Sequence, residues 1–385
     1  MSNGWQMCRF DEVIDVYQPE TVAVKNLDVD GTYPVYGANG IIGYHSQFNH
    51  SESELLLGCR GSVGSVHISS SRSWINGNAM VVRPKDTRLT RDFIRYGLLG
   101  GFSIADAISG TAQPQITRTS LAPVLVPVPP LDEQKRIVAK LDQALGYVDE
   151  VVDSAQKSKE EISALWQQTL AKFFDLSNNE PLNPREGSET PAVPLSDLCS
   201  KITDGSHNPP KGGPESEFLM LSSRDIQNDQ IAPVGPRFLN EKQFNDEHRR
   251  TNLVHGDVLL TIVGTIGRAA IYLGEPARAT LQRSVAVMTP KEALLNPRYL
   301  MYFFHSSSNF FESEAQGTAQ KGFYLGQLRE MLIPWISIDE QSAIVDKLDN
   351  LKSEINTLDA TKAATLTEAA NLRATVLSAA FAGDL

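Results

Sequence analysis

The sequence predicts a mixed α/β (α+β) protein in which two mixed domains are separated by two long antiparallel helices that form a coiled coil. The main observation behind this is an internal repeat. Residues 109–142 and 316–349 are identical at 15 of 34 positions without a gap. The 385-residue chain is therefore a tandem duplication of a segment of about 200 residues.

The copies also match upstream of this segment, in the same order. A Leu-Leu pair at Leu56 precedes the turn Gly61–Gly64, and a Leu-Leu pair at Leu259 precedes the turn Gly264–Gly267. Short runs rich in β-branched and aromatic residues, separated by Gly and Asn, are typical of strands. They predict strands within Tyr33–Gly40, Ala79–Arg83 and Val285–Met288, and helices are predicted at Arg91–Leu99 and Pro297–Phe304.

The last part of each copy has helical periodicity. Apolar residues at a spacing of three to four form a predicted helix seam, at Val138, Leu141, Leu145, Val148, Val152 and Ile162 in the first copy and at Ile344, Leu348, Leu351, Ile355 and Leu358 in the second. Pro129-Pro130 followed by Asp132-Glu133 marks the first helix start, because acidic residues are favourable near a helix N-terminus. An unbroken helix of about 45 residues would be roughly 65–70 Å long.

A helix with a narrow apolar seam must bury that seam against a partner. The economical arrangement is an antiparallel coiled coil between the copies; the alternative is that each helix packs on its own domain. Ser177–Pro194, rich in Pro, Asn, Glu and Ser, is typical of an exposed connector. The predicted division is 1–130 and 181–337 for the mixed domains, and 131–180 and 338–385 for the helices.

The net charge of −11 does not exclude a nucleic-acid partner. Segments 131–176 and 338–385 carry −3 and −4, whereas the mixed domains are nearly neutral and contain many arginines. A nearly neutral domain can still hold a basic face.

Composition places the chain among globular proteins of a reducing compartment. Hydrophobic residues make up 41% and charged residues 21%, and no apolar run approaches the roughly 20 residues of a membrane-spanning helix. The N-terminus has neither the basic start nor the apolar stretch of a signal peptide. Cys8, Cys59 and Cys199 are odd in number and scattered, which predicts neither disulfides nor a metal site and favours the cytoplasm.

Motifs for catalysis are missing from the sequence. It contains no GxxxxGK[ST] phosphate loop, no HExxH motif and no GxSxG elbow. Asn208-Pro-Pro-Lys211 begins like the element with which amino-methyltransferases hold a flipped base, but lysine stands where the stacking aromatic would be. Glu133-Gln-Lys135 resembles part of a nuclease metal element, but the second copy has Glu340-Gln-Ser342. We interpret these as a Pro-rich loop and a helix N-terminus, and predict no catalytic and no metal-binding residue.

Taken together, the motifs resemble those of the specificity subunit of a type I restriction–modification system (the HsdS family). The resemblance covers essentially the whole chain. It rests on YPVYGANGIIGYH at 33–45, the Leu-Leu pair with its Gly-x-x-Gly turn in both copies, the GTAQ segments at 110–113 and 317–320, LDEQKRIVAKL and IDEQSAIVDKL, and LRATVLSAAFAGDL at 372–385. The second copy departs by lacking YGANGIIGYH and having a different stretch at 201–250, as expected if the two domains read different sequences.

The resemblance implies a non-catalytic subunit whose two target-recognition domains and two helices form a pseudo-two-fold internal repeat. Each domain would be similar to the small recognition domain of an adenine-N6 methyltransferase. Together they would read a bipartite site in double-stranded DNA, and the helix pair would set the spacer. The helices would also carry two modification subunits, which hold S-adenosylmethionine. ATP-driven restriction subunits would join through these, and this chain would bind no cofactor itself.

Polar residues in the loops of both domains are the candidate DNA contacts, because such side chains distinguish base edges and bind phosphates. In the first domain they are Asn39, Tyr44, His45, Arg60, Ser62, Arg72, Asn76, Asn78, Gln113, Gln115 and Arg118; in the second they are Lys201, Ser206, His207, Arg224, Arg249, Arg250, Thr265, Arg268, Gln282, Arg283, Gln320 and Lys321. Each also has an interpretation as an ordinary surface or turn residue. The paired Gly loops and the GTAQ loops are favoured because both recur, although their glycines more simply set turn geometry.

Large aromatic residues accompany the helix seam: Trp166, Phe173, Phe174 and Phe381. We expect them partly on a face that meets a partner subunit, since aromatic residues are enriched at protein interfaces.

The sequence is also compatible with two rival functions. A solitary methyltransferase or nuclease with a degenerate motif would bind S-adenosylmethionine or act on DNA alone. A purely protein-binding module would lack salt-dependent binding to duplex DNA, which neutralisation of phosphates produces.

Overall fold

The computed structural model describes residues 5–28, 30–110, 113–174, 191–227, 229–274, 278–315 and 322–385. The chain divides into two compact units, which are Met1–Lys157 with Thr361–Leu385, and Ser158–Ala360. Gln320 and Lys321, the second GTAQ segment and residues 177–190 of the predicted connector lie outside the described residues.

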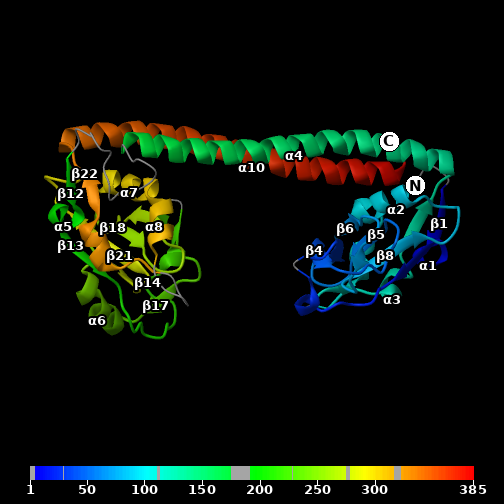
Figure 1. Ribbon diagram of the computed structural model, residues 1–385, viewed down its shortest axis with the longest axis horizontal. Coiled ribbons are helices and arrows are strands. Elements are labelled where there is room, and N and C mark those ends of the chain that lie inside the picture. Colours follow the sequence, from blue (N-terminus) through cyan, green and yellow to red (C-terminus); the bar gives the residue numbers. More distant parts are fainter. Residues whose placement is uncertain are drawn as a thin grey trace. The chain divides into compact units, whose positions relative to one another are not determined.

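The mixed domain of the first unit holds two larger sheets (Figure 1). The four-stranded antiparallel sheet has the order β2 (Ile14–Tyr17), β8 (Ala79–Pro84), β5 (Leu55–Gly58), β6 (Val66–Ile68), and the three-stranded sheet has the order β4 (Gly40–His45), β3 (Tyr33–Gly37), β7 (Trp74–Ile75), with β3 and β7 parallel. Two smaller pairs are β1 (Gln6–Arg9) with β11 (Leu125–Val128), and β9 (Ile108–Ser109) with β10 (Gln115–Ile116). The helical segments are α1 (Phe10–Val13), η1 (Val24–Asn26), α2 (Arg91–Tyr96), η2 (Gly97–Gly101), η3 (Ile104–Ala107) and α3 (Arg118–Leu121). The strands expected from the sequence are present, and the helix expected at Arg91–Leu99 keeps α-helical form to Tyr96.

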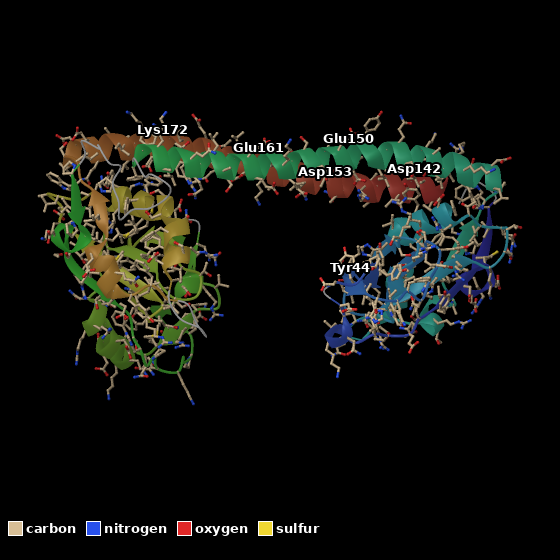
Figure 2. All side chains as sticks on the ribbon, viewed as in Figure 1. Tyr44, Asp142, Glu150, Asp153, Glu161 and Lys172 are labelled. Atoms are coloured by element: carbon tan, nitrogen blue, oxygen red, sulfur yellow. The ribbon has the colours of Figure 1, made fainter. Side chains whose placement is uncertain are left out.

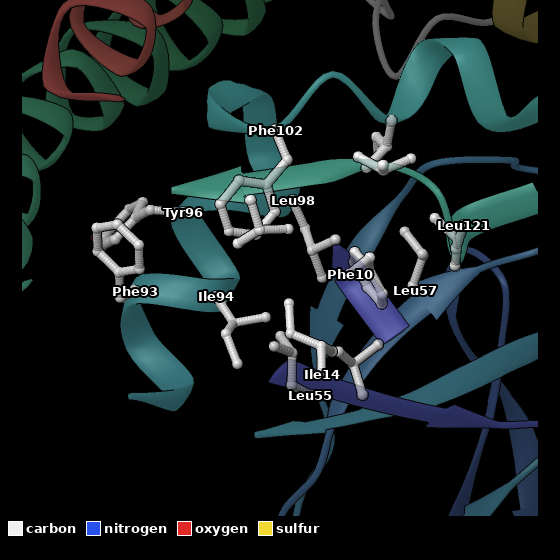
Figure 3. Packing of buried hydrophobic residues seen from close by; sticks show 14 of the residues in the cluster. Phe10, Ile14, Leu55, Leu57, Phe93, Ile94, Tyr96, Leu98, Phe102 and Leu121 are labelled. Atoms are coloured by element: carbon white, nitrogen blue, oxygen red, sulfur yellow. The ribbon is translucent and has the colours of Figure 1, made fainter. Parts of the chain in front are cut away.

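The strand β5 is buried on both faces, which explains its run of three leucines. Leu55 and Leu57 point into the main core with Phe10 and Ile14 (Figure 3). Leu56 points to the opposite face of the sheet, into a smaller cluster with aromatic and β-branched residues of β3, β7 and β8. Because successive strand residues alternate between faces, a strand between two cores must be apolar throughout.

The second mixed domain has two larger sheets with the same strand connectivity as those of the first. Its sheets have the orders β13 (Cys199–Asp204), β21 (Val285–Pro290), β18 (Val258–Thr261), β19 (Ala269–Ile271), and β17 (Arg237–Leu239), β14 (Phe218–Leu221), β20 (Ala279–Leu281), and the smaller pairs are β12 (Ala192–Pro194) with β22 (Leu332–Pro334), and β15 (Ile226–Gln227) with β16 (Gln230–Ile231). The helical segments are α5 (Leu195–Leu198), η4 (Ser223–Asp225), α6 (Glu241–Thr251), α7 (Pro297–Ser306), α8 (Ser308–Glu314) and α9 (Leu325–Glu330). The β17–β14–β20 sheet occupies the topological place of β4–β3–β7, with β14 and β20 again parallel. The divergent stretch therefore supplies the same sheet from unrelated residues.

Two long helices complete the structure, α4 (Leu131–Phe173) and α10 (Ile338–Ala382), and each contributes to both units. In the first unit Leu141 and Leu145 of α4 share a core with Leu377 and Ala380 of α10. Along α4, the guanidinium of Arg136 donates to the Leu385 carbonyl (2.6 Å), and Asp149 pairs with Arg373 of α10. Residue numbers rise along one helix as they fall along the other, so the helices are antiparallel.

The second unit repeats this arrangement with the other ends of the helices. Trp166, Leu170 and Phe174 of α4 share a core with Val345 and Leu348 of α10. The predicted antiparallel pairing is confirmed within each unit. The alternative of each helix packing only on its own domain does not hold, because the end of each helix enters the core of the other copy's unit.

Two details of the predicted helix seam require correction. Leu351 and Leu358 are exposed by 37% and 48%, and Val345 is buried beside Leu348 instead. Leu348, Leu351 and Leu358 lie on one face of α10, but the buried face is rotated from it towards Val345. The sequence pattern does not show this rotation. Trp166 and Phe174 are also not on a free face, because both lie in the core of the second unit.

Candidate nucleic-acid interface

Three loops that are distant in sequence meet at the end of strand β5. The backbone N–H of Cys59 donates to the Asn78 carbonyl (2.9 Å), and its carbonyl accepts from the Ile116 N–H (3.0 Å). Arg60 and Gln115 form a β-bridge beside this point. The sequence-predicted residues Arg60, Asn78 and Gln115 are thus brought together by the backbone.

The second domain reproduces this junction at the end of β18. The N–H of Ile262 donates to the Ser284 carbonyl (2.9 Å), and the Ile262 carbonyl accepts from the Phe323 N–H (2.8 Å). Arg283 lies next to this point, and its N–H donates to the Ser206 carbonyl (2.9 Å). The second GTAQ segment lies outside the described residues, but the strand-like contact that follows it is present as a bridge between Val263 and Gly322.

The paired Gly loops close in the same way in both domains. The Gly64 N–H donates to the Gly58 carbonyl, and the Gly267 N–H donates to the Thr261 carbonyl, each at 2.9 Å. Gly64 and Gly267 have φ values of +85° and +90°, a region that favours glycine. These glycines serve the turn, and side chains such as Ser62 and Thr265 are exposed on it.

Several predicted contact residues are exposed arginines whose guanidinium group is not paired with a carboxylate of the described residues. Among the predicted contact residues, five exposed arginines form no ion pair with any described carboxylate: Arg60, Arg72, Arg224, Arg268 and Arg283. Arg118 and Arg249 are exposed as well, but lie 3.8 Å from Asp15 and 3.7 Å from Asp246. A guanidinium without a carboxylate partner is available for phosphates or guanine edges.

Three predicted contact residues are instead occupied within the fold. Asn76 is buried. Its side-chain oxygen accepts from the Val22 N–H and its amide nitrogen donates to the Val22 carbonyl, both at 3.0 Å. Lys201 donates to the Asn252 carbonyl (2.8 Å) and lies 3.1 Å from the fully buried carboxylate of Asp257. Ser206 is buried. The polar side chains of Asn76 and Lys201 stabilise the fold, because a buried polar group needs a partner. A contact of these three residues with DNA stays a prediction.

A hollow in the second domain gathers further predicted residues. It is lined by His207, Arg250 and Arg283, together with Asp204 and Tyr324. The guanidinium of Arg250 donates to the carbonyls of Asp204 (3.0 Å) and Gly205 (3.1 Å), and His207 Nε2 lies 2.8 Å from the Asp204 carboxylate. Asp204 therefore orients two basic side chains at the hollow. Sequence reasoning missed Asp204 and the exposed Tyr324, since neither belongs to a recurrent motif.

The remaining predicted residues of the first domain lie on its surface. Tyr44 is 45% exposed on the edge strand β4, and Figure 2 shows it at the margin of the domain. His45 packs against the Trp74 ring at 5.1 Å, and Asn39 and Gln113 are exposed in loops. Gln282 of the second domain is half-buried. Ile41 and Ile42 beside Tyr44 are also exposed, which the strand pattern did not predict.

The resemblance of the Glu133 segment to a nuclease metal element has a structural explanation. Glu133 lies 2.7 Å from Arg136, and hydrogen bonding to this guanidinium lowers the pKa of Glu133. Burial raises the pKa of the Cys199 thiol to about 12, so this thiol is not a nucleophile at neutral pH. Among the described residues no group of three or more His, Cys, Asp or Glu side chains could hold a metal ion.

Within the described residues no helix is long and apolar enough to cross a membrane.

Comparison with known families decides the identity of the two domains. The family model of the type I restriction modification DNA specificity domain matches residues 2–163 and 219–368. The chain belongs to the type I restriction–modification specificity family. As a specificity subunit it is a DNA-recognition subunit rather than a catalytic one.

Relatives agree with this assignment. The chain is 24% identical over 354 residues to the Type I restriction enzyme EcoBI specificity subunit of Escherichia coli, covering 86% of this chain and 73% of that protein. It is 25% identical over 362 residues to the putative type I restriction enzyme specificity subunit S.HindORF215P of Haemophilus influenzae, covering 90% and 88%. A solved chain from work on complex assembly and conformational transition of the type I R-M system shares the fold, with a TM-score of 0.73, 21% identity and coverage of 99% and 98%.

Proposed function

We propose that each mixed domain of this specificity subunit reads one half of a bipartite site in double-stranded DNA. The observation that carries this is the duplicated junction at Cys59 and Ile262, where three loops meet in both domains. Arg60 at one junction and Arg283 at the other have no ion-pair partner among the described residues. Two equivalent junctions with different side chains suit two different half-sites, because side chains on a shared backbone frame determine which bases are read.

The helices α4 and α10 carry two modification subunits in this proposal. Apolar residues are exposed at equivalent positions of the repeat: Val151 and Leu358 by 46% and 48%, and Leu165 and Leu372 by 62% and 52%. The surface of α4 beside these positions is charged, with Glu150 next to Val151, and Asp153 and Glu161 between Val151 and Leu165 (Figure 2). Exposed apolar residues that recur in both copies support two equivalent docking sites.

The partners would supply the remaining chemistry. The modification subunits would hold S-adenosylmethionine and methylate adenine at N6, and ATP-driven restriction subunits would join through them. This chain would bind no cofactor and would act in the cytoplasm, where such a complex meets DNA.

Mapping of methylated adenines in DNA exposed to this chain together with its modification subunits tests the proposal. We expect two short specified segments separated by a spacer of constant length. Methylation at one continuous site, or without sequence preference, would contradict the proposal of a bipartite site. Binding of the complex to such DNA is expected to weaken steeply with salt, since phosphate contacts release counterions.

A further inference from the structure

A buried glutamine joins each long helix to its domain, with the same set of hydrogen bonds in both copies. Gln134 of α4 is fully buried. Its side-chain carbonyl accepts from the Thr90 N–H (2.9 Å), and its amide donates to the carbonyls of Arg88 (2.7 Å) and Pro129 (2.9 Å). All three partners are backbone groups, so the side chain is bonded to the fold itself rather than to another mobile side chain.

Gln341 of α10 makes the same three bonds. It is also fully buried; its carbonyl accepts from the Asn296 N–H (2.8 Å), and its amide donates to the carbonyls of Leu294 and Ile336, both at 2.9 Å. Thr90 and Asn296 are the N-cap residues of α2 and α7. Each glutamine thus bonds the start of a long helix to the start of a domain helix.

A second contact lies eight residues further along each long helix. The Tyr96 hydroxyl of α2 donates to the Asp142 carboxylate of α4, and the Tyr302 hydroxyl of α7 donates to Asp349 of α10 at 2.5 Å. Eight residues correspond to about 12 Å along a helix. A helix held at one point can pivot, whereas a helix held at two separated points has a defined direction relative to its domain.

Unlike apolar packing, these hydrogen bonds require a defined geometry between donor and acceptor. Hydrogen bonds are directional, and every group around Gln134 would be left unsatisfied in the interior if the helix rotated or slid. The surrounding apolar core tolerates small displacements better, because the hydrophobic effect is non-directional.

We infer that Gln134 and Gln341, supported by Tyr96 and Tyr302, are positioning residues that set the orientation of each recognition domain on its helix. Through this orientation they determine the spacer length that the complex accepts between the half-sites. The inference rests on the proposed bipartite function. It assigns to the repeated Asp-Glu-Gln segment a role in spacer selection rather than in contact with DNA.

The test uses the complete chain with its modification subunits and a DNA library in which the two half-sites are separated by different spacers. Gln134→Leu is nearly isosteric but removes the acceptor and both donors. We expect its preference for the best spacer over spacers one base pair shorter or longer to fall by about five-fold or more, because small misplacements reduce rates strongly. The Thr90 amide, which loses its acceptor, is expected to exchange its hydrogen faster.

Two further variants separate positioning from stability. Tyr96→Phe removes only a hydroxyl and is expected to broaden the spacer profile in the same direction with little loss of folded protein. Val81→Ala, in the small cluster of the first unit away from the long helices, lowers stability and is expected to leave the spacer profile unchanged. If Gln134→Leu and Tyr96→Phe both keep a spacer profile as sharp as that of the wild-type complex, the inference is wrong but the bipartite proposal still holds. A wild-type complex without spacer preference would overturn the bipartite proposal and the inference with it.

Discussion

The ammonium group of Lys352 lies over the indole ring of Trp166, 5.1 Å from the ring centroid. Lys352 belongs to the helix of the second copy and Trp166 to the helix of the first. Lys352 also lies 3.1 Å from the carboxylate of Asp229 in the β15–β16 hairpin. One lysine therefore connects both helices and the recognition domain within the second unit.

Removal of this indole ring should destabilise the second unit. Trp166 is buried and packs edge-on against Tyr302 at 5.9 Å, so Trp166→Ala is expected to lower the free energy of unfolding by about 3–5 kcal/mol. Tyr147→Ala is the matched control, because Tyr147 is an aromatic residue of α4 that is 61% exposed. Urea unfolding monitored by circular dichroism measures both, and equal effects of the two changes would contradict the packing described here.

The stability of the second unit should decrease in mild acid because of His305. Burial lowers the pKa of His305 below its ordinary value of 6.5, although Asp229 at 3.2 Å acts in the opposite direction. The folded state therefore keeps this ring neutral while the unfolded state binds a proton below about pH 6.5. The stability contribution is complete above that pH and is lost as the pH falls towards the folded-state pKa.

His305→Gln should reduce this pH dependence. We expect the loss of unfolding free energy between about pH 7.5 and 5.5 to become smaller in the variant, but not to vanish. Burial also lowers the pKa of His248 in the same unit. A steeper slope in His305→Gln would show that the sign is wrong.

The two junction arginines should affect opposite halves of the DNA site. Arg60→Ala and Arg283→Ala each remove an exposed guanidinium, and each is expected to cost about 1–3 kcal/mol of binding free energy if it contacts a base. Competition binding with duplexes mutated in one half-site at a time assigns each arginine to a half. Arg9→Ala is a suitable control, since Arg9 is paired with Asp11 at 3.0 Å. Unchanged affinity and sequence preference in both junction variants would remove these residues from the interface.

Charge placed on the exposed apolar positions of α10 should weaken association with the modification subunits. Leu358→Asp and Leu372→Asp change exposed side chains, so stability is expected to change by less than about 0.5 kcal/mol. Size-exclusion chromatography with light scattering would show loss of one modification subunit per substitution. Ala370→Asp introduces the same charge at another exposed position of α10, and it is expected to leave the complex intact.

Much of the architecture could be predicted from patterns along the chain. The repeat, the long helices and the strands at β3, β8 and β21 were predicted because periodicity and turn residues are local signals. The equivalence of β14 to β3 was not predictable, since Phe218–Leu221 shares no motif with Tyr33–Gly37 and the relation exists only in strand order. The candidate DNA contacts remain predictions, and Asn76, Lys201 and Ser206 show why: polar loop residues that stabilise a turn have the same composition as those that contact a ligand.

The amino-acid sequence alone determined that this protein is a duplication with a mixed domain and a long amphipathic helix in each copy. These properties follow from repetition and from the periodic placement of apolar side chains. Only the tertiary structure decided that Leu348 rather than Leu351 lies in the helix seam, that Trp166 completes the core of the other copy's domain, and that Gln134 bonds three backbone groups. Such choices depend on which surfaces meet, and burial of a side chain is a property of both surfaces together.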